Sequence, residues 1–292
     1  MKRHVEYKCY IDSIQLRIED IGTEVLFKEK YLTEINDRYE IVHRDKSSFR
    51  KVFTIRTFTN HKTKEQHLLI SFNGFIKYDT FRDGLIQRDF FKVIDTLLSN
   101  DIKFYLNKID LAIDFKDINF TDLYVQRAKY TGVQKKISNL DATTLNKIIE
   151  NKESFYLEKT SSKKNSSQRI YIYHKTIKEK NNGNTTIKDD IYRVEAELVN
   201  FNKIKKQYDK NISNIELELL SIEFDNRRNK KADEYKLLQL EISKKQYQQE
   251  FNVALLQEIK SRFDKYEIKY KDKCITFDYS IVEDILVLCK NL

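Results

Sequence analysis

The sequence predicts an α+β protein whose mostly antiparallel sheet is covered by helices on one face. Two observations support this prediction. Before residue 200, several short segments alternate between apolar and polar residues, as half-buried strands do. From Phe201 onward the chain has long segments rich in Lys, Glu, Gln and Leu, with few residues that interrupt helices. We therefore expect a catalytic α+β core in residues 1–200 and a mainly helical part of the same domain in residues 201–292.

The first half of the predicted core has the order strand, strand, helix, strand. Alternation predicts the strands, and apolar residues at helical spacing predict the helix. The expected elements are a weak strand pair interrupted near Asp12 (7–18), a hairpin (51–59 and 66–72), an amphipathic helix (85–99) and an acidic strand (108–115).

A second unit of the same kind follows, so the core is expected to consist of two β-β-α-β-like halves. Its elements are a helix near 143–150 and strands near 154–157, 169–175 and 192–200. In the C-terminal part, the expected elements are helices at 202–208, 215–224 and 232–263, with joints at Asn211 and Asn226, a short hairpin within 267–279 and a helix at 281–288.

Composition limits the class of protein. The chain has 292 residues, 40% hydrophobic and 34% charged, with a formal net charge of +9 that favours polyanionic partners. No apolar run approaches the roughly 18–20 residues that span a bilayer, and the first residues lack the apolar core of a secretion signal. The three cysteines lie far apart, without zinc-site spacing. We expect a cytoplasmic protein with no membrane partner.

Three predicted strands each have one apolar and one polar face. In residues 108–115 the polar face carries Asp110 and Asp114, two residues that alternate with apolar neighbours. In 192–199 the polar face carries Arg193, Glu195 and Glu197. In 169–175 it carries Arg169, Tyr171, Tyr173 and Lys175. If the three strands lie in one sheet, their acids, cations and tyrosines converge.

The order K-I-D-L-A-I-D-F, R-I-Y-I-Y-H-K and Y-R-V-E-A-E-L resembles the motifs of rolling-circle replication initiators of the plasmid trans-acting type. It also resembles filamentous-phage gene II/X replication proteins and the nicking relaxases of integrative elements. The resemblance covers about residues 53–200 and rests on short motifs. One position departs from it, because His174 stands where the family usually has Asp.

The resemblance implies a fold distantly like that of the HUH endonucleases, and a site-specific DNA nickase. Such an enzyme cuts one strand with a tyrosine and stores the bond as a 5′-phosphotyrosine. In the family the catalytic tyrosine lies downstream of the R-x-E strand, in a helical region, which selects Tyr208, Tyr235 and Tyr247. Tyr247 is favoured because Lys244 and Lys245 precede it, and Tyr235 is the second choice.

These assignments leave alternatives open. Tyr247 shares a helix face with Leu240 and Phe251, so it could instead be a core residue. Tyr171 and Tyr173 remain candidates because they project from the polar face itself.

A nickase also needs a cation at the phosphate. The five histidines form no H-x-H pair, so a metal would be held by carboxylates, which suits Mg²⁺ or Mn²⁺. We expect Asp110 and Glu195 as ligands and Asp114 and Glu197 as further candidates. Lys175 and Arg193 would hold phosphate or orient the acids. The alternative for the whole set is a buried salt-bridge network between strands, such as Asp110 with Arg193.

The sequence therefore favours a metal-dependent DNA nickase that initiates rolling-circle replication of a plasmid, phage or integrative element. The alternatives are a relaxase for conjugative mobilisation, a nuclease that uses water, and a DNA-binding regulator without catalysis. The expected partner is DNA, at an origin and as a single-stranded nick site. A host helicase and a second copy of the chain remain open as further partners.

Overall fold

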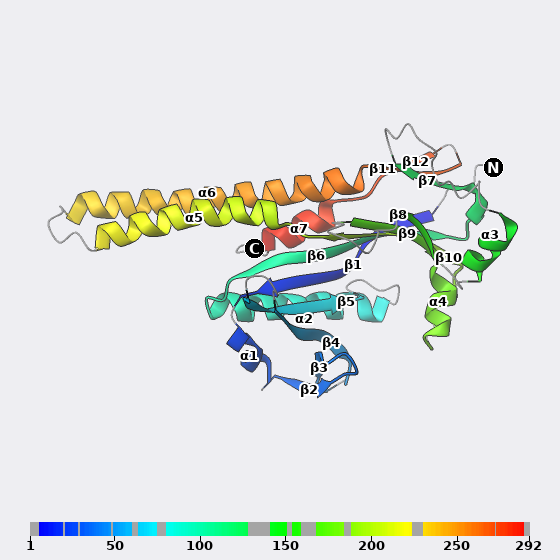
Figure 1. The fold of residues 1–292 in the computed structure, drawn as a ribbon, viewed down its shortest axis with the longest axis horizontal. Helices are drawn as coiled ribbons and strands as arrows, with labels where there is room; N and C mark the ends of the chain where they lie inside the picture. The colour runs from blue at the N-terminus through cyan, green and yellow to red at the C-terminus, as the bar shows by residue number, and fades with distance from the viewer. Residues whose placement is uncertain are drawn as a thin grey trace.

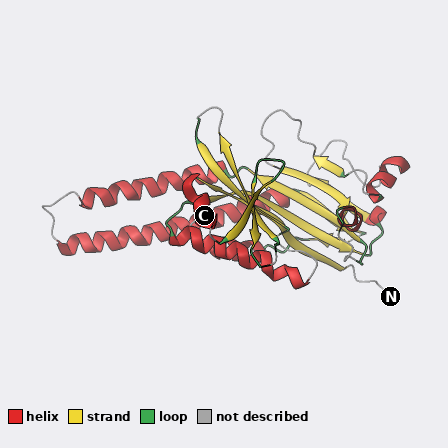
Figure 2. Ribbon diagram, turned by 90° about the horizontal axis from the view of Figure 1, so that it is seen from below, coloured by secondary structure: helices red, strands yellow, loops and turns green. Residues whose placement is uncertain are grey.

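A computed structural model gives the fold, in which a twisted antiparallel sheet carries helices and a long helical arm (Figures 1 and 2). The structure describes residues 6–19, 21–28, 30–47, 49–59, 64–74, 80–127, 141–150, 154–158, 168–183, 188–223, 230–271 and 273–288. In this part of the chain no helix is long and apolar enough to cross a membrane.

Nine strands form the main sheet in the order β2-β3-β4-β5-β1-β6-β10-β9-β8, and each neighbouring pair is antiparallel. The strands are β1 (Glu6–Ile18), β2 (Tyr31–Ile35), β3 (Ile41–Asp45), β4 (Lys51–Thr59), β5 (Gln66–Asn73), β6 (Phe104–Lys116), β8 (Phe155–Glu158), β9 (Gln168–His174) and β10 (Ile191–Val199). The class is therefore α+β, as the sequence predicts.

Three strands form a second, small sheet in the order β12-β11-β7, which joins the middle of the chain to its C-terminal part. These strands are β7 (Leu123–Arg127), β11 (Tyr266–Tyr270) and β12 (Lys273–Ile275). The helical elements are η1 (Ile21–Glu24), α1 (Val25–Lys28), α2 (Thr80–Ser99), η2 (Phe120–Asp122), α3 (Ala142–Ile149), α4 (Lys175–Asn181), α5 (Asn202–Glu223), α6 (Lys230–Phe263) and α7 (Ser280–Leu288).

One face of the main sheet is apolar and packs against helices. The core cluster combines Leu111 of β6 with Phe90 of α2, Leu255 of α6 and Val282 of α7, all almost completely buried. Burying such side chains contributes roughly 1.5–3 kcal/mol each. Because side chains alternate along a strand, the opposite face receives the polar residues of the same strands.

The helices α5 and α6 pair and extend beyond the sheet as an arm (Figure 1). At its base, Arg262 donates hydrogen bonds to the carbonyls of Val199 and Asn200, at 2.7 and 3.2 Å, which ties α6 to the end of β10. Further out, Ile215 and Leu240 form a small cluster separate from the main core.

Several details differ from the expected elements. Residues 6–18 form one strand rather than two, with a β-bulge at Asp12 that inserts a residue without ending the strand. Helix α5 runs through Asn211 without a joint, while Asn226 lies outside the described residues. Strand β9 ends at His174, so Lys175 begins a helix that the sequence did not predict.

Candidate functional site

The strands β1, β6, β10 and β9 lie side by side and bring the predicted site residues onto one face. Residues directly opposite each other in a register share a face of the sheet. Asp114 lies opposite Arg193, and Asp110 lies opposite Glu197. On the next pair of strands, Glu195 lies opposite Tyr171. The expected convergence of these three strands is thus observed.

Arg193 is the centre of a buried ion-pair network. Its side chain is only 1% exposed, and it donates two hydrogen bonds to the Asp114 carboxylate, at 2.6 and 2.8 Å. A third bond goes to Asp12, the residue in the β1 bulge. Burial opposes the charge of Asp12, but the guanidinium holds its pKa below the usual range. Asp114 is therefore engaged by an arginine rather than open to a metal ion.

Glu195 receives hydrogen bonds from two tyrosines on the neighbouring strand. Tyr173 donates its hydroxyl at 2.7 Å, and Tyr171 donates to the other carboxylate oxygen. Burial raises the pKa of both phenols above their ordinary value, and the Glu195 charge adds to the shift. Both tyrosines are therefore protonated hydrogen-bond donors in this arrangement.

Asp110 is the acid with unused coordination capacity. One of its oxygens accepts from Ser13 and lies 3.0 Å from the Lys108 ammonium. The other, Oδ1, is buried and accepts no hydrogen bond from any residue that the structure describes. Burial raises the pKa of Asp110 to about 7, with Lys108 and Ser13 acting against the shift and Glu195 adding to it.

The unpaired oxygen of Asp110 fits a divalent cation. Mg²⁺ is commonly held by one or two carboxylates, with water and substrate phosphate completing the octahedron. The charge of Glu195 acts on Asp110, and these two acids would supply the carboxylates. Among the described residues there is no group of three or more His, Cys, Asp or Glu side chains with metal-site geometry. A metal here would therefore depend on two acids.

The remaining predicted cations and acids lie around Asp110 and Glu195. Glu197 is 3.3 Å from Lys108 and 3.8 Å from Arg169, so it is paired at the edge of the site. Lys175 is buried at the start of α4 and forms an ion pair with Glu179 at 2.8 Å. Its charge nevertheless acts on Asp12 and Asp114, which places it within electrostatic reach of the network.

The helical tyrosines lie elsewhere. Tyr247 packs against Ile215 and Leu240 in the arm, in agreement with the core alternative for this residue. Tyr235 is 64% exposed on the distal part of the same helix. Tyr208 donates a hydrogen bond to Gln248 across the two arm helices. None of the three has an interaction with the carboxylates in the part of the chain that the structure describes.

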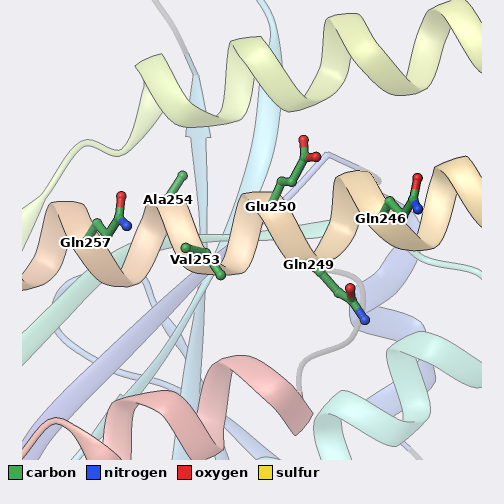
Figure 3. A pocket seen from close by; sticks show the side chains of 6 residues that line it. All are labelled: Gln246, Gln249, Glu250, Val253, Ala254 and Gln257. Atoms are coloured by element: carbon green, nitrogen blue, oxygen red, sulfur yellow. The ribbon is translucent and has the colours of Figure 1, made fainter.

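A hollow of about 500 Å³ on the surface of α6 is lined mainly by uncharged residues (Figure 3). Its residues are Gln246, Gln249, Glu250, Val253, Ala254 and Gln257. Such a lining offers one carboxylate and no paired acids, so this hollow lacks the chemistry of the sheet site.

Three site residues were missed by the sequence analysis. Ser13 and Asp12 come from β1, where the bulge makes the alternation too weak to assign faces. Lys178 comes from α4, and its ammonium lies 4.0 Å from the centre of the Tyr173 ring. Burial lowers its pKa, with Glu195 acting in the opposite direction. In the sequence, Lys178 is one of three lysines between positions 175 and 180.

His174 occupies the other side of β9, as alternation predicts. Its Nε2 contacts the Asp190 carboxylate, and its Nδ1 lies 2.6 Å from the Ile149 carbonyl at the end of α3. The ring stacks on Tyr192 at 4.4 Å. The residue that departs from the family motif thus connects α3 to the sheet and does not face the carboxylates.

No protein-family model matches the chain, and no curated protein matches it significantly.

Proposed function

We propose that this protein is a metal-dependent DNA nickase that cuts one strand at a replication origin and starts rolling-circle replication. The observation that carries the proposal is the meeting of two buried acids, Asp110 and Glu195, with the hydroxyls of Tyr171 and Tyr173. The proposal assigns the nucleophile to one of these tyrosines, proton acceptance to Glu195 and cation binding to Asp110 and Glu195. The distant HUH-like relationship and the two β-β-α-β-like halves belong to the same proposal.

The nucleophile in this proposal is a tyrosine of β9 rather than of the arm. A phenol oxygen attacks phosphorus, the bond to the 3′ oxygen breaks, and a 5′-phosphotyrosine forms. Glu195 accepts the phenolic proton, and the leaving 3′ oxygen takes up a proton from solvent. Tyr171 is half-buried, whereas Tyr173 is 1% exposed, so a phosphodiester reaches Tyr171 more readily in this conformation.

Mg²⁺ or Mn²⁺ held by Asp110 and Glu195 would offset the charge that develops on the phosphoryl oxygens. Asp114 has a positioning role here, because it fixes Arg193 next to the site, and Arg193 and Lys178 supply positive charge near Glu195. Lys175 acts in the same way at longer range, and Glu197 orients Lys108.

A nicking assay tests the proposal. The substrate is a supercoiled plasmid that carries the DNA flanking the gene, incubated with Mg²⁺ and then probed for protein bound to 5′ ends. We expect Tyr171→Phe to remove the covalent adduct and to reduce nicking by about 10²-fold or more. Tyr247→Phe and Tyr235→Phe serve as matched controls in the arm and should retain both.

Each outcome separates one alternative. If only Tyr173→Phe removes the adduct, the nucleophile is Tyr173 rather than Tyr171, and the nickase proposal stands. Cleavage without any adduct would indicate a nuclease that uses water. The burial of Tyr173 favours this alternative over the others, because it keeps a phosphodiester away from that hydroxyl. Binding without cleavage in all proteins would indicate a regulator and overturn the proposal. Replication and conjugative mobilisation share this chemistry, so a plasmid replication assay in cells distinguishes them.

A further inference from the structure

A basic row crosses three strands on the same face as the carboxylates. Leu69 of β5 lies opposite Arg17 of β1 on one side and opposite Arg56 of β4 on the other. Ser13, which bonds Asp110, is two alternations before Arg17 on β1. The two arginines therefore share the polar face with the proposed site, roughly 13 Å along the strand from it.

The two arginines are not neutralised as Arg193 is. Arg56 is exposed, and the Nε of Arg17 is buried without a hydrogen-bond partner among the residues that the structure describes. The nearby acid Glu19 is already paired with Lys205 at 3.0 Å. Burying a guanidinium nitrogen without an acceptor is costly. Neither arginine forms an ion pair within the described part of the chain, so the row is complementary to an added anion.

An exposed aromatic ring lies next to the row. Phe58 of β4 is 42% exposed and lies opposite His67, with the ring centres 4.9 Å apart. Arg17 is close enough to His67 to contribute to the lowering of its pKa, after burial. An exposed ring beside cations is the arrangement that stacks unpaired bases while phosphates are held. A duplex does not offer its base faces in this way.

A continuous line of polar side chains connects this patch to the carboxylates. Asn107 of β6 donates to Gln15 at 2.5 Å, and Gln15 donates to Ser71 of β5 at 2.7 Å. Gln15 lies between Ser13 and Arg17 on the same face of β1. The polar face between cations and acids therefore carries hydrogen-bonding groups suited to a sugar-phosphate backbone.

We infer that the polar face of β1, β5 and β4 binds the unpaired DNA strand that leads to the nick, with Arg17 and Arg56 on phosphates and Phe58 under a base. This inference rests on the proposed nickase function, since that function places a DNA strand at Asp110. It adds which face of the sheet receives the strand and which side chains hold it.

Fluorescence anisotropy tests the inference without requiring cleavage. The probes are a labelled oligothymidylate and a random-sequence duplex of the same length, with full-length protein in EDTA. We expect Arg17→Gln/Arg56→Gln to weaken oligothymidylate binding about tenfold or more and to lower the salt slope by about 1.4, or 0.7 for each lost phosphate contact. Phe58→Ala should weaken it about fivefold or more.

The control double variant, Arg38→Gln/Lys271→Gln, removes the same charge from the β2–β3 turn and from the β11–β12 turn of the small sheet, and should bind as the unmodified protein does. Arg17→Lys/Arg56→Lys keeps the charge and should retain most of the affinity, which separates charge from misfolding. Equal losses in the control and test variants, or an unchanged affinity in Arg17→Gln/Arg56→Gln, would overturn the inference.

The two proposals fail differently. If the protein nicks its plasmid but binds oligothymidylate independently of Arg17 and Arg56, the face is wrong and the nickase stands. If binding depends on both arginines and no cleavage occurs with Mg²⁺, the nickase proposal fails and the binding face stands.

Discussion

At the scale of single residues, two buried groups differ in their surroundings. The Arg193 guanidinium is surrounded by carboxylates, whereas one oxygen of Asp110 has no hydrogen-bond donor. Arg193 is surrounded by Asp114, Asp12 and, at 3.9 Å, Glu195, so removing any partner would leave a buried charge less compensated. Asp110 is also buried, yet its Oδ1 has no hydrogen-bond donor in the described structure. The charges of the first arrangement are compensated, whereas the second leaves a buried oxygen without a donor, which costs stability.

We predict that Asp110→Asn stabilises the metal-free protein above pH 7 while abolishing nicking. The pKa of Asp110 is raised to about 7 by burial, so the folded protein binds its proton more tightly than the unfolded chain does. The sign follows from this: the carboxyl lowers stability as pH rises from about 4 to 7. Above that range, the variant should gain about 1–3 kcal/mol.

Urea denaturation from pH 4 to pH 8.5 measures this difference, and thermal melts with Mg²⁺ provide the second reading. Mg²⁺ should raise the melting temperature of the unmodified protein at pH 8 and have a smaller effect on Asp110→Asn. A pH-independent difference between the two proteins would show that Asp110 is not buried in its charged form.

At the scale of elements, the β2–β3–β4 end of the sheet depends on an aromatic cluster with a histidine inside it. His43 is completely buried, stacks on Phe53 at 4.4 Å and meets Phe27 and Tyr31 edge to face. Neither ring nitrogen has a hydrogen-bond partner among the described residues. Burial therefore lowers the pKa of His43 to about 4.

We predict that this histidine makes the protein acid-sensitive. The unfolded chain binds the His43 proton near pH 6.5, whereas the folded protein binds it only near pH 4. The contribution of neutral His43 to the free energy of unfolding is therefore complete above pH 6.5 and is lost as the pH falls towards 4. The loss amounts to at most about 3 kcal/mol. His43→Phe should remove this loss, as shown by denaturation at pH 7 and pH 4.5. An equal acid loss in the variant would assign the sensitivity to other groups.

The elements that the sequence predicted best are those with an uninterrupted period. Strand β10 and residues 108–115 of β6 alternate without interruption, so their faces were assigned correctly. Strand β1 was split at Asp12 because the bulge breaks the alternation there, and pairing partners such as Asp114 with Arg193 depend on strand register, which no local pattern specifies. The β9 tyrosines were on the predicted face, but only the fold brings them to Glu195.

At the scale of the whole molecule, the chain divides into a sheet with its site and an arm with its own small core. Leu255 and Phe251 of α6 belong to the main core, whereas Ile215 and Leu240 form the separate cluster. The expected helical C-terminal part therefore has two roles, since its base covers the sheet and its distal half does not. No periodicity in the sequence marks this division.

We predict that the distal arm is dispensable for folding and for nicking. Replacing residues 209–247 by a short glycine–serine linker between Tyr208 and Gln248 keeps that hydrogen-bonded pair and removes both Tyr235 and Tyr247. The shortened protein should unfold cooperatively and retain the covalent adduct. If the shortened protein folds but forms no adduct, the nucleophilic tyrosine lies in the arm.

Because Asp12 lies in the β1 bulge, its ion pair with Arg193 does not depend on the pairing of β1 with β6. Ile11 and Ser13 pair with the consecutive residues Leu111 and Asp110. Within the paired part of β1, Asp12 is therefore the one residue that has no partner on β6. Losing it by an in-frame deletion of a single codon would leave every later side chain of β1 on its present face. The third carboxylate around Arg193 could thus be acquired or discarded during divergence without redesigning the strand that bears it.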